Sequence, residues 1–204
     1  MYSEFLDSNV TISTKIRDFY EWHGGVKYFG FWAIEITSLA CQNKIKSFQK
    51  HLQNRLHPCY LRQPHITLVA SGLLSEDGFN QNVLAHQIQR IKKGNLKAFS
   101  LKLSYCNSFS TCPYLFIDDS FGSLEVLREC INSKDKENNP SKYVPHVTLG
   151  FYDNEYSTVE IVEDISNLNS VDIEFQVDEV IFAQYETKDI QGPYEVLHRI
   201  KLDN

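Results

Sequence analysis

The chain has 204 residues, 42% of them hydrophobic and 23% charged, so it is long enough to bury the core of one large domain or two small lobes. Its formal net charge of −6 argues against a protein that coats nucleic acid non-specifically. No apolar run approaches the roughly 20 residues of a membrane helix and no signal-peptide pattern opens the chain, so we expect a cytoplasmic protein, a monomer by default, with no membrane partner.

The chain opens with an expected helix, a strand and a second helix. Apolar and aromatic side chains have helical spacing over residues 12–22, and two glycines follow. Residues 29–36 are rich in aromatic and β-branched side chains, which favours a buried strand. Thr37 or Ser38 can then cap a helix that runs to about Leu56.

Strands and helices continue to alternate in the middle of the chain. Residues 64–72 have the pattern of a strand, and residues 79–93 have a helical apolar stripe. Residues 98–105 alternate apolar and polar side chains, and residues 114–117 fit the partner of that strand in a hairpin. A third long helix is expected at residues 124–131.

The last third repeats this order. A charged, asparagine-rich loop at residues 135–141 precedes a second strand that begins near residue 145 and ends at residues 151–152. Residues 158–168 suggest a helix. Three strand-like segments close the chain, at residues 171–177, 180–185 and 194–202. The layout is a rough internal duplication without a low-complexity linker.

Charge and cysteine are distributed unevenly. Residues 1–103 hold 13 basic and 7 acidic side chains, whereas residues 104–204 hold 7 and 19. Either one part of the surface attracts phosphates, or two solvated faces differ in sign, because halves of a sequence need not be halves of a structure. The five cysteines have no zinc or redox spacing, so we expect reduced, mostly structural thiols.

Two segments share one pattern of five residues. Residues 64–68 are PHITL and residues 145–149 are PHVTL. Side chains two positions apart point to the same face of a strand, so His65 should lie beside Thr67, and His146 beside Thr148. Each strand would then present an imidazole and a hydroxyl on one face and bury its apolar side chains on the other.

These side chains suit reactions of phosphate esters. A neutral imidazole can accept a proton from water or a ribose hydroxyl, and a protonated imidazole can donate one to the leaving oxygen. Threonine hydroxyls can donate hydrogen bonds to the non-bridging oxygens. The surroundings of His65 and His146 set the order of their pKa values, so the sequence leaves open which is the base. With no P-loop, zinc motif or carboxylate cluster, we expect no metal and no cofactor.

With the two motifs 81 residues apart, the chain resembles the two-histidine (2H) phosphoesterases, in the branch labelled 2′-5′ RNA ligase-like. The likeness extends from about Phe29 to Leu202. It implies an α+β fold of two pseudo-symmetric lobes, each an antiparallel sheet with helices packed on it, and an active-site cleft between them. Residues 1–28 would then be an N-terminal extension, and residues 29–204 a single bilobal domain.

The same resemblance implies a function. We expect a metal-independent phosphodiesterase that cleaves 2′,3′-cyclic phosphates or 2′-5′ phosphodiester bonds in RNA ends or small nucleotides. His65 and His146 would be catalytic, and Thr67 and Thr148 would bind phosphate. The alternatives are a non-catalytic module that binds nucleotides or RNA, and an enzyme that degrades a cyclic signalling nucleotide.

Four further residues are candidates for substrate binding. Arg62, three residues before His65, could reach a phosphate. Phe151 and Tyr152 follow the second motif and could stack on a base. Tyr194 matches a position where members of the family often carry an aromatic side chain near the cleft. The alternative for each of the four is an ordinary surface or core position. We expect base selectivity in the loops at residues 107–113 and 135–141.

Overall fold

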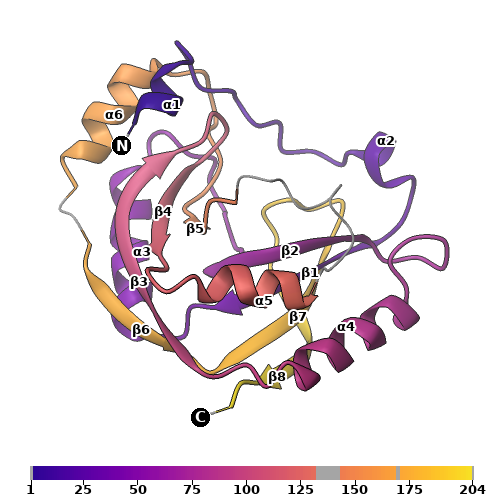
Figure 1. The fold of residues 1–204 in the computed structure, drawn as a ribbon. Coiled ribbons are helices and arrows are strands. Elements are labelled where there is room, and N and C mark those ends of the chain that lie inside the picture. The colour runs from indigo at the N-terminus through magenta and orange to yellow at the C-terminus, as the bar shows by residue number, and fades with distance from the viewer. Residues whose placement is uncertain (1, 132–142, 169–170, 204) are drawn as a thin grey trace.

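The computed structural model describes residues 2–131, 143–168 and 171–203 (Figure 1). In these residues two four-stranded antiparallel sheets carry helices on their outer faces, which confirms the predicted α+β fold with two sheets. The loop expected at residues 135–141 lies outside the described residues.

The described elements alternate much as the sequence predicts. The helices are α1 (Ser3–Leu6), α2 (Tyr20–His23), α3 (Leu39–His51), α4 (Gln81–Lys93), α5 (Ser123–Ile131) and α6 (Thr158–Ser166). The strands are β1 (Tyr28–Glu35), β2 (His65–Leu73), β3 (Phe99–Ser108), β4 (Pro113–Asp118), β5 (His146–Thr148), β6 (Ile173–Val177), β7 (Glu179–Glu186) and β8 (Tyr194–Lys201).

The two sheets repeat one arrangement. The strand order is β2-β1-β7-β8 in the first sheet and β5-β4-β3-β6 in the second. The histidine motifs lie on β2 and β5, and each of these is an edge strand that pairs with the strand before it in the chain. We call the parts built on the first and second sheets the first and second lobes. Each lobe combines distant parts of the sequence, because β7 and β8 return to pair with β1.

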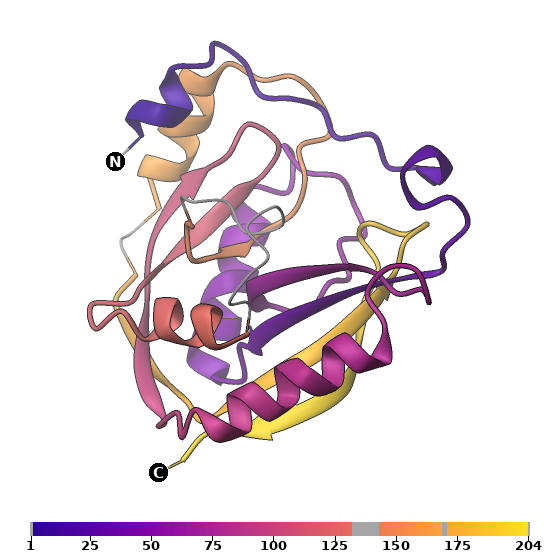
Figure 2. The same cartoon turned by 45° about the vertical axis from the view of Figure 1, so that its right-hand side comes forward.

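Helices cover the outer face of each sheet. The helices α3 and α6 pack against β6 and β3, on the second lobe, whereas α4 contacts β8 and α5 contacts β2 on the first. Figures 1 and 2 both show α3 behind β3 and β4, and α4 alongside β7 and β8. The ring N–H of Trp32 donates to Oε1 of Gln87 on α4 over 2.7 Å, within the core. The helices therefore pack on the outer faces of the sheets and leave the inner faces of the histidine strands uncovered by helix.

The apolar residues of both motifs are buried, as the alternation predicts. Their exposed fractions are 2% or less at Ile66, Leu68, Val147 and Leu149. Because alternate side chains of a strand point to opposite faces, the histidine and threonine side chains face away from this core. Burial of the four apolar side chains therefore determines which face of each strand carries the polar pair.

The helix expected at residues 12–22 is wrong. Only Tyr20–His23 is helical, and Gly24, with a φ of 56°, ends that turn. Ile12 and Ile16, the supposed inner face, are 54% and 40% exposed. Backbone N–H groups in this segment instead bond carbonyls far along the chain: Thr11 bonds Tyr156, Ile12 bonds Ser110, and Thr14 bonds Tyr152. Residues 8–14 therefore form a strap over the second lobe, since these bonds replace those of a helix.

Two other boundaries differ from the expectation. The strand β5 ends at Thr148 rather than at residues 151–152, and Gly150 adopts a φ of 149°, which glycine accepts more readily than other residues. The helix α3 ends at His51, five residues before the expected end at Leu56. Its expected start is correct, because the hydroxyl of Ser38 accepts a hydrogen bond from the N–H of Cys41.

Candidate active site

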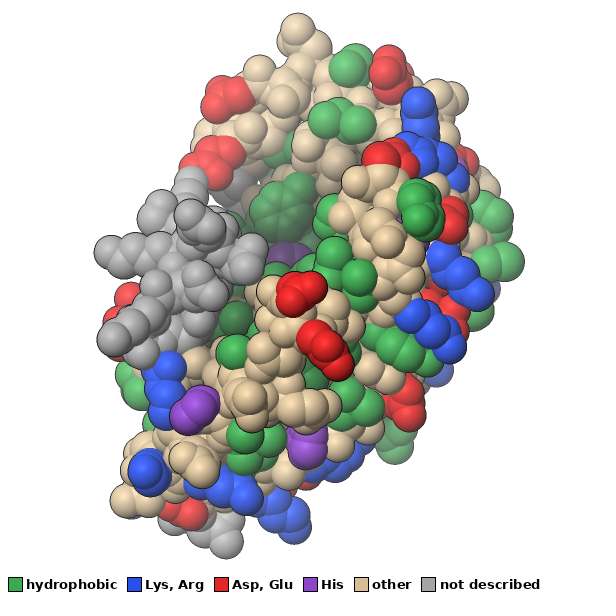
Figure 3. All heavy atoms as spheres, turned by 90° about the vertical axis from the view of Figure 1, so that its right-hand side faces the viewer, with side chains coloured by type: hydrophobic (Ala, Val, Ile, Leu, Met, Phe, Trp, Pro, Cys, Tyr) green, Lys and Arg blue, Asp and Glu red, His purple; other side chains and the backbone are tan. Residues whose placement is uncertain are grey.

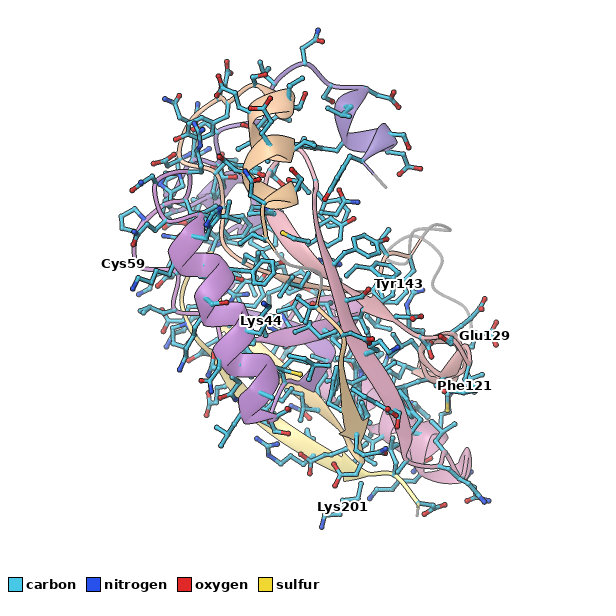
Figure 4. All side chains as sticks on the ribbon, turned by 90° about the vertical axis from the view of Figure 1, so that its left-hand side faces the viewer. Lys44, Cys59, Phe121, Glu129, Tyr143 and Lys201 are labelled. Carbon is cyan, nitrogen blue, oxygen red and sulfur yellow. The ribbon has the colours of Figure 1, made fainter. Side chains whose placement is uncertain are left out.

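The two histidine strands meet where the lobes join. The edge strands β2 and β5 contact each other directly. Tyr143, labelled in Figure 4, lies on the segment that leads into β5. Its hydroxyl donates a 2.8 Å hydrogen bond to the carbonyl of Thr67 on β2. Figure 3 shows a hollow in one face of the molecule, with hydrophobic side chains and a histidine deep inside it. The fold thus brings the two motifs from distant parts of the sequence to one place.

The two imidazoles make matching hydrogen bonds. Nδ1 of His65 lies 2.8 Å from the carbonyl oxygen of Gln63, and Nδ1 of His146 lies 2.7 Å from that of Val144. A carbonyl oxygen can only accept, so each Nδ1 carries a hydrogen, and in the neutral ring the lone pair is on Nε2. In both motifs Nε2 is therefore the atom left for proton transfer.

The proline of each motif explains why both histidines make the same main-chain hydrogen bond. The carbonyl of Pro64 accepts from the N–H of Ile36, and that of Pro145 accepts from the N–H of Ile117, each over 3.0 Å. Proline holds the residue before it in an extended conformation and, at the start of an edge strand, costs no ladder hydrogen bond. The carbonyl two residues before each histidine is thus left for the imidazole.

His65 lies against aromatic rings at the inner face of the first sheet. Its ring centroid is 5.3 Å from that of Phe31 and 5.2 Å from that of Tyr194. The pKa of His65 is lowered to about 4, chiefly by burial; the hydrogen bond to Gln63 opposes this effect, and the charges of Arg62 and His146 add to it. In the ligand-free protein His65 is therefore neutral at pH 7.

His146 has its own aromatic neighbours. Its ring centroid lies 5.0 Å from that of Phe109 and 5.4 Å from that of Tyr114. Burial lowers the pKa of His146, against the opposing effect of its hydrogen bond to Val144. Our sequence interpretation missed Phe31, Phe109 and Tyr114. Tyr114 could have been found from the alternation of the strand expected at residues 114–117; in the structure it lies directly opposite Thr148 in the sheet.

Thr67 and Thr148 stand two positions after the histidines, and both are partly exposed. Each therefore shares the face of its histidine. The thiol of Cys112 lies near the hydroxyls of Thr111 and Thr148. Burial raises the pKa of that thiol to about 11, so Cys112 remains protonated at neutral pH and is not a nucleophile.

Arg62 is held beside His65 by the loop between β7 and β8. Its Nε donates to the carbonyl of Gly192 over 2.7 Å and its Nη2 to that of Ile190 over 3.1 Å. The guanidinium lies 3.9 Å above the ring of Tyr185. The loop thus fixes the charge close to His65, and contact with a substrate phosphate remains a prediction for Arg62.

The structure places the three aromatic candidates differently. Tyr194 is buried against His65, and its hydroxyl donates to Oε1 of Glu35 over 3.0 Å. Phe151 is half-buried and packs edge-on against Tyr60. The prediction for Tyr152 is wrong: its ring is fully buried and its hydroxyl lies 2.7 Å from Oγ of Ser108, so it belongs to the core and cannot stack on a base.

The described residues also include other potential metal ligands, thiols and helices. No three His, Cys, Asp or Glu side chains among them gather closely enough to suggest a metal site. The five cysteines are free thiols. Within the same part of the chain, every helix is too short or too polar to span a membrane.

Comparison with known proteins identifies a family and a fold. A family model described as the 2′-5′ RNA ligase superfamily matches residues 37–189. The chain is 14% identical to TT0787 of Thermus thermophilus, with a TM-score of 0.60, covering 85% of this chain and 97% of that one. It is also 14% identical to E. coli LigT in complex with phosphate, with a TM-score of 0.59 and coverage of 88% and 100%.

A protein described as a phosphoesterase is 16% identical, with a TM-score of 0.57 and coverage of 86% and 99%. No curated protein sequence matches the chain. At these identities the solved structures establish only that this chain shares their fold, which here consists of two lobes, each built on an antiparallel sheet.

Proposed function

The chain belongs to the 2′-5′ RNA ligase superfamily of two-histidine phosphoesterases, and from this premise we propose that it is a metal-independent phosphodiesterase. Its substrates are 2′,3′-cyclic phosphates or 2′-5′ phosphodiester bonds, in RNA ends or in small nucleotides. One observation carries the proposal: His65 and His146, on the touching edge strands of two lobes, both hold their Nδ1 on a main-chain carbonyl and leave Nε2 for proton transfer.

The reaction follows from these two Nε2 atoms. In a cyclic phosphate, a water oxygen attacks phosphorus and gives its proton to one Nε2, while the other imidazolium gives its proton to the ribose oxygen as the P–O bond breaks. On a 2′-5′ linkage the neighbouring ribose hydroxyl replaces water, and the product is a cyclic phosphate. Opposed imidazoles suit the in-line geometry of both reactions.

Their surroundings suggest different roles for the two histidines. Burial and the charge of Arg62 lower the pKa of His65 to about 4, whereas burial alone, without a neighbouring arginine, lowers the pKa of His146; the repulsion between the two imidazolium charges acts on both. When one proton is shared between them, His146 holds it more strongly. We assign His65 as the general base and His146 as the general acid.

Thr67 and Thr148 complete the phosphate site in this proposal. A hydroxyl two residues after each histidine can donate to a non-bridging oxygen, where negative charge grows in the transition state. Arg62 adds a fixed positive charge on the side of His65. The bound phosphate and 3′-AMP of the E. coli LigT structures support a nucleotide substrate, because those proteins share the fold.

The test uses purified protein in excess chelator. Nucleoside 2′,3′-cyclic phosphates and 2′-5′ oligoadenylates are incubated with it, and products are separated by chromatography. His65→Ala and His146→Ala should each lower kcat/KM by about 10²- to 10⁴-fold. His198→Ala, at an exposed histidine on β8, is the matched control and should retain full activity.

Three other outcomes of this assay would contradict the proposal or favour an alternative. Turnover that survives either motif variant would overturn the proposal. Loss of turnover in chelator, restored by a divalent ion, would overturn the metal-independent reaction. Tight binding of RNA ends without any product would favour the non-catalytic binding module instead.

A further inference from the structure

A pocket of about 460 Å³ lies beside His146 on the inner face of the second lobe. Its lining includes Phe109, Tyr114 and Val144, the same residues whose rings and carbonyl contact the imidazole of His146. Pockets of this size hold ligands the size of a nucleoside. We call it the aromatic pocket.

Stacked rings form the floor of the aromatic pocket. Tyr105 and Phe116 stack with centroids 4.9 Å apart, and Phe109 and Tyr114 with centroids 4.3 Å apart. Tyr114 lies opposite Thr148 in the sheet and Phe116 opposite His146, so both rings share the face of the histidine motif. The aromatic pocket is therefore a continuation of the candidate active site away from phosphorus.

The N-terminal segment forms another wall of the pocket. Ser3, Glu4, Phe5 and Ser8 line it, and Phe5 is 5% exposed. The hydroxyl of Thr158, at the start of α6, donates to the carbonyl of Ser8 over 2.7 Å. This segment lies before the part of the chain that the family model matches, which begins at residue 37. The hydrogen bond of Thr158 thus anchors this wall on α6.

The lining indicates which part of a nucleotide fits. Glu4 and Tyr114 both line the pocket, so the carboxylate of Glu4 already places negative charge there. A second phosphate would be repelled there. Flat faces of tyrosine and phenylalanine instead favour an uncharged planar ring, because stacking on aromatic side chains is the common means of holding a base.

We propose that the aromatic pocket, with residues 3–8 as one wall, binds the nucleobase of the substrate. The proposal rests on the proposed function, since it takes the phosphate to lie between His65 and His146. The N-terminal segment then belongs to the substrate site.

The experiment compares substrates with and without a base. The full chain is assayed with a nucleoside 2′,3′-cyclic phosphate and with the 2,3-cyclic phosphate of 1-O-methylribose. Tyr105→Ala removes a stacking ring that does not contact His146, and Ser110→Trp fills the pocket from its rim. Each should raise KM for the nucleotide about tenfold and leave KM for the base-free substrate unchanged. Tyr20→Ala, at a tyrosine that is 64% exposed, is the matched control.

Equal effects on both substrates, or none on either, would overturn the proposal. Thermal melting checks that each variant is folded, and Ser110→Trp serves if Tyr105→Ala is not. If wild-type protein turns over neither substrate, the proposed function fails but the pocket is still tested, because adenosine and guanosine are titrated into wild type and variants by calorimetry. Binding to wild type that the variants weaken supports the pocket, and no binding to wild type overturns it.

Discussion

At the level of single residues, His65 and His146 have alike hydrogen bonds and unlike electrostatic surroundings. Both use Nδ1 to hold a carbonyl, and burial lowers both pKa values, but only His65 is also affected by the charge of Arg62. The two motifs share one sequence pattern, but their histidines therefore differ in proton affinity. In the proposed reaction this difference favours His65 as the base and His146 as the acid.

The lowered pKa values predict an acidic optimum. The reaction needs one neutral and one protonated imidazole, and both pKa values lie below 6.5 in the free protein. The fraction in the active state therefore declines as pH rises above 6.5, because His146 loses its proton. We expect kcat/KM for a nucleoside 2′,3′-cyclic phosphate to peak below pH 6.5 when measured from pH 4 to 9. An optimum above pH 7 would contradict the assignment.

The proposed roles predict a split between substrates. In a ribonucleoside 2′-(4-nitrophenyl phosphate), the leaving group departs without a proton, so only the base is needed. We expect His146→Ala to retain most of the wild-type rate on this ester while losing at least 10²-fold on a cyclic phosphate. His65→Ala should lose activity on both. The reverse pattern would exchange the two roles, and equal losses for both variants would argue against separate ones.

At the level of elements, the strap of residues 8–14 shows how a segment with helical spacing can lack a helix. Thr11 is 1% exposed, and its hydroxyl accepts from the N–H of Tyr156 and donates to the carbonyl of Asn154. Together with the backbone bonds of this segment, these contacts satisfy its polar groups from the second lobe. The strap leads from α1, which lines the aromatic pocket, toward the first sheet (Figure 1).

Thr11→Val should destabilise the protein by about 1–2 kcal/mol, because valine has a similar shape but leaves the N–H of Tyr156 without its acceptor. The measurement is urea unfolding followed by circular dichroism. Ser13→Ala is the control, since that hydroxyl bonds an exposed carbonyl at Asp153, and it should change the free energy of unfolding by less than about 0.5 kcal/mol. If Thr11→Val lowered the free energy of unfolding no more than is expected for Ser13→Ala, the hydrogen bonds of Thr11 would add little stability.

At the level of the whole molecule, the site depends on how two sheets meet. The histidine strands are both edges, and Tyr143 ties the approach to β5 to the carbonyl of Thr67 on β2. The guanidinium of Arg128 covers the ring of Tyr143 at 3.7 Å and its Nε donates to the carbonyl of Leu68. Because β7 and β8 pair with β1, the basic and acidic halves of the sequence share one sheet, and the charge asymmetry of the sequence does not separate the lobes.

Tyr143→Phe should loosen this connection without removing the ring. We expect a loss of about 1 kcal/mol in the free energy of unfolding, from one hydrogen bond. Since the bond sets one motif against the other, we also expect kcat to fall roughly three- to tenfold. Steady-state kinetics and urea unfolding measure the two effects, with Tyr20→Phe as the control at an exposed tyrosine. An unchanged kcat would show that packing alone positions the two strands.

Local periodicity determined much of this protein from the sequence alone. The alternation around His65 and His146 predicted which side chains are buried and which are left for chemistry, because a strand turns every second residue to the same face. The same reasoning predicted the strands, the long helices and the duplicated order. These features depend on backbone geometry over a few residues, which the sequence specifies directly.

Features that depend on contacts between distant parts of the chain were decided only by the tertiary structure. In the segment where a helix was expected, residues 12–22, backbone N–H groups bond carbonyls far along the chain instead of carbonyls within a helix. Tyr152 is buried in the core beside Ser108. Packing of the two sheets likewise placed Phe31 and Tyr194 at His65, and Phe109 and Tyr114 at His146, where burial lowers both histidine pKa values. The sequence determined the groups that could react, and their surroundings came from contacts that no local pattern encodes.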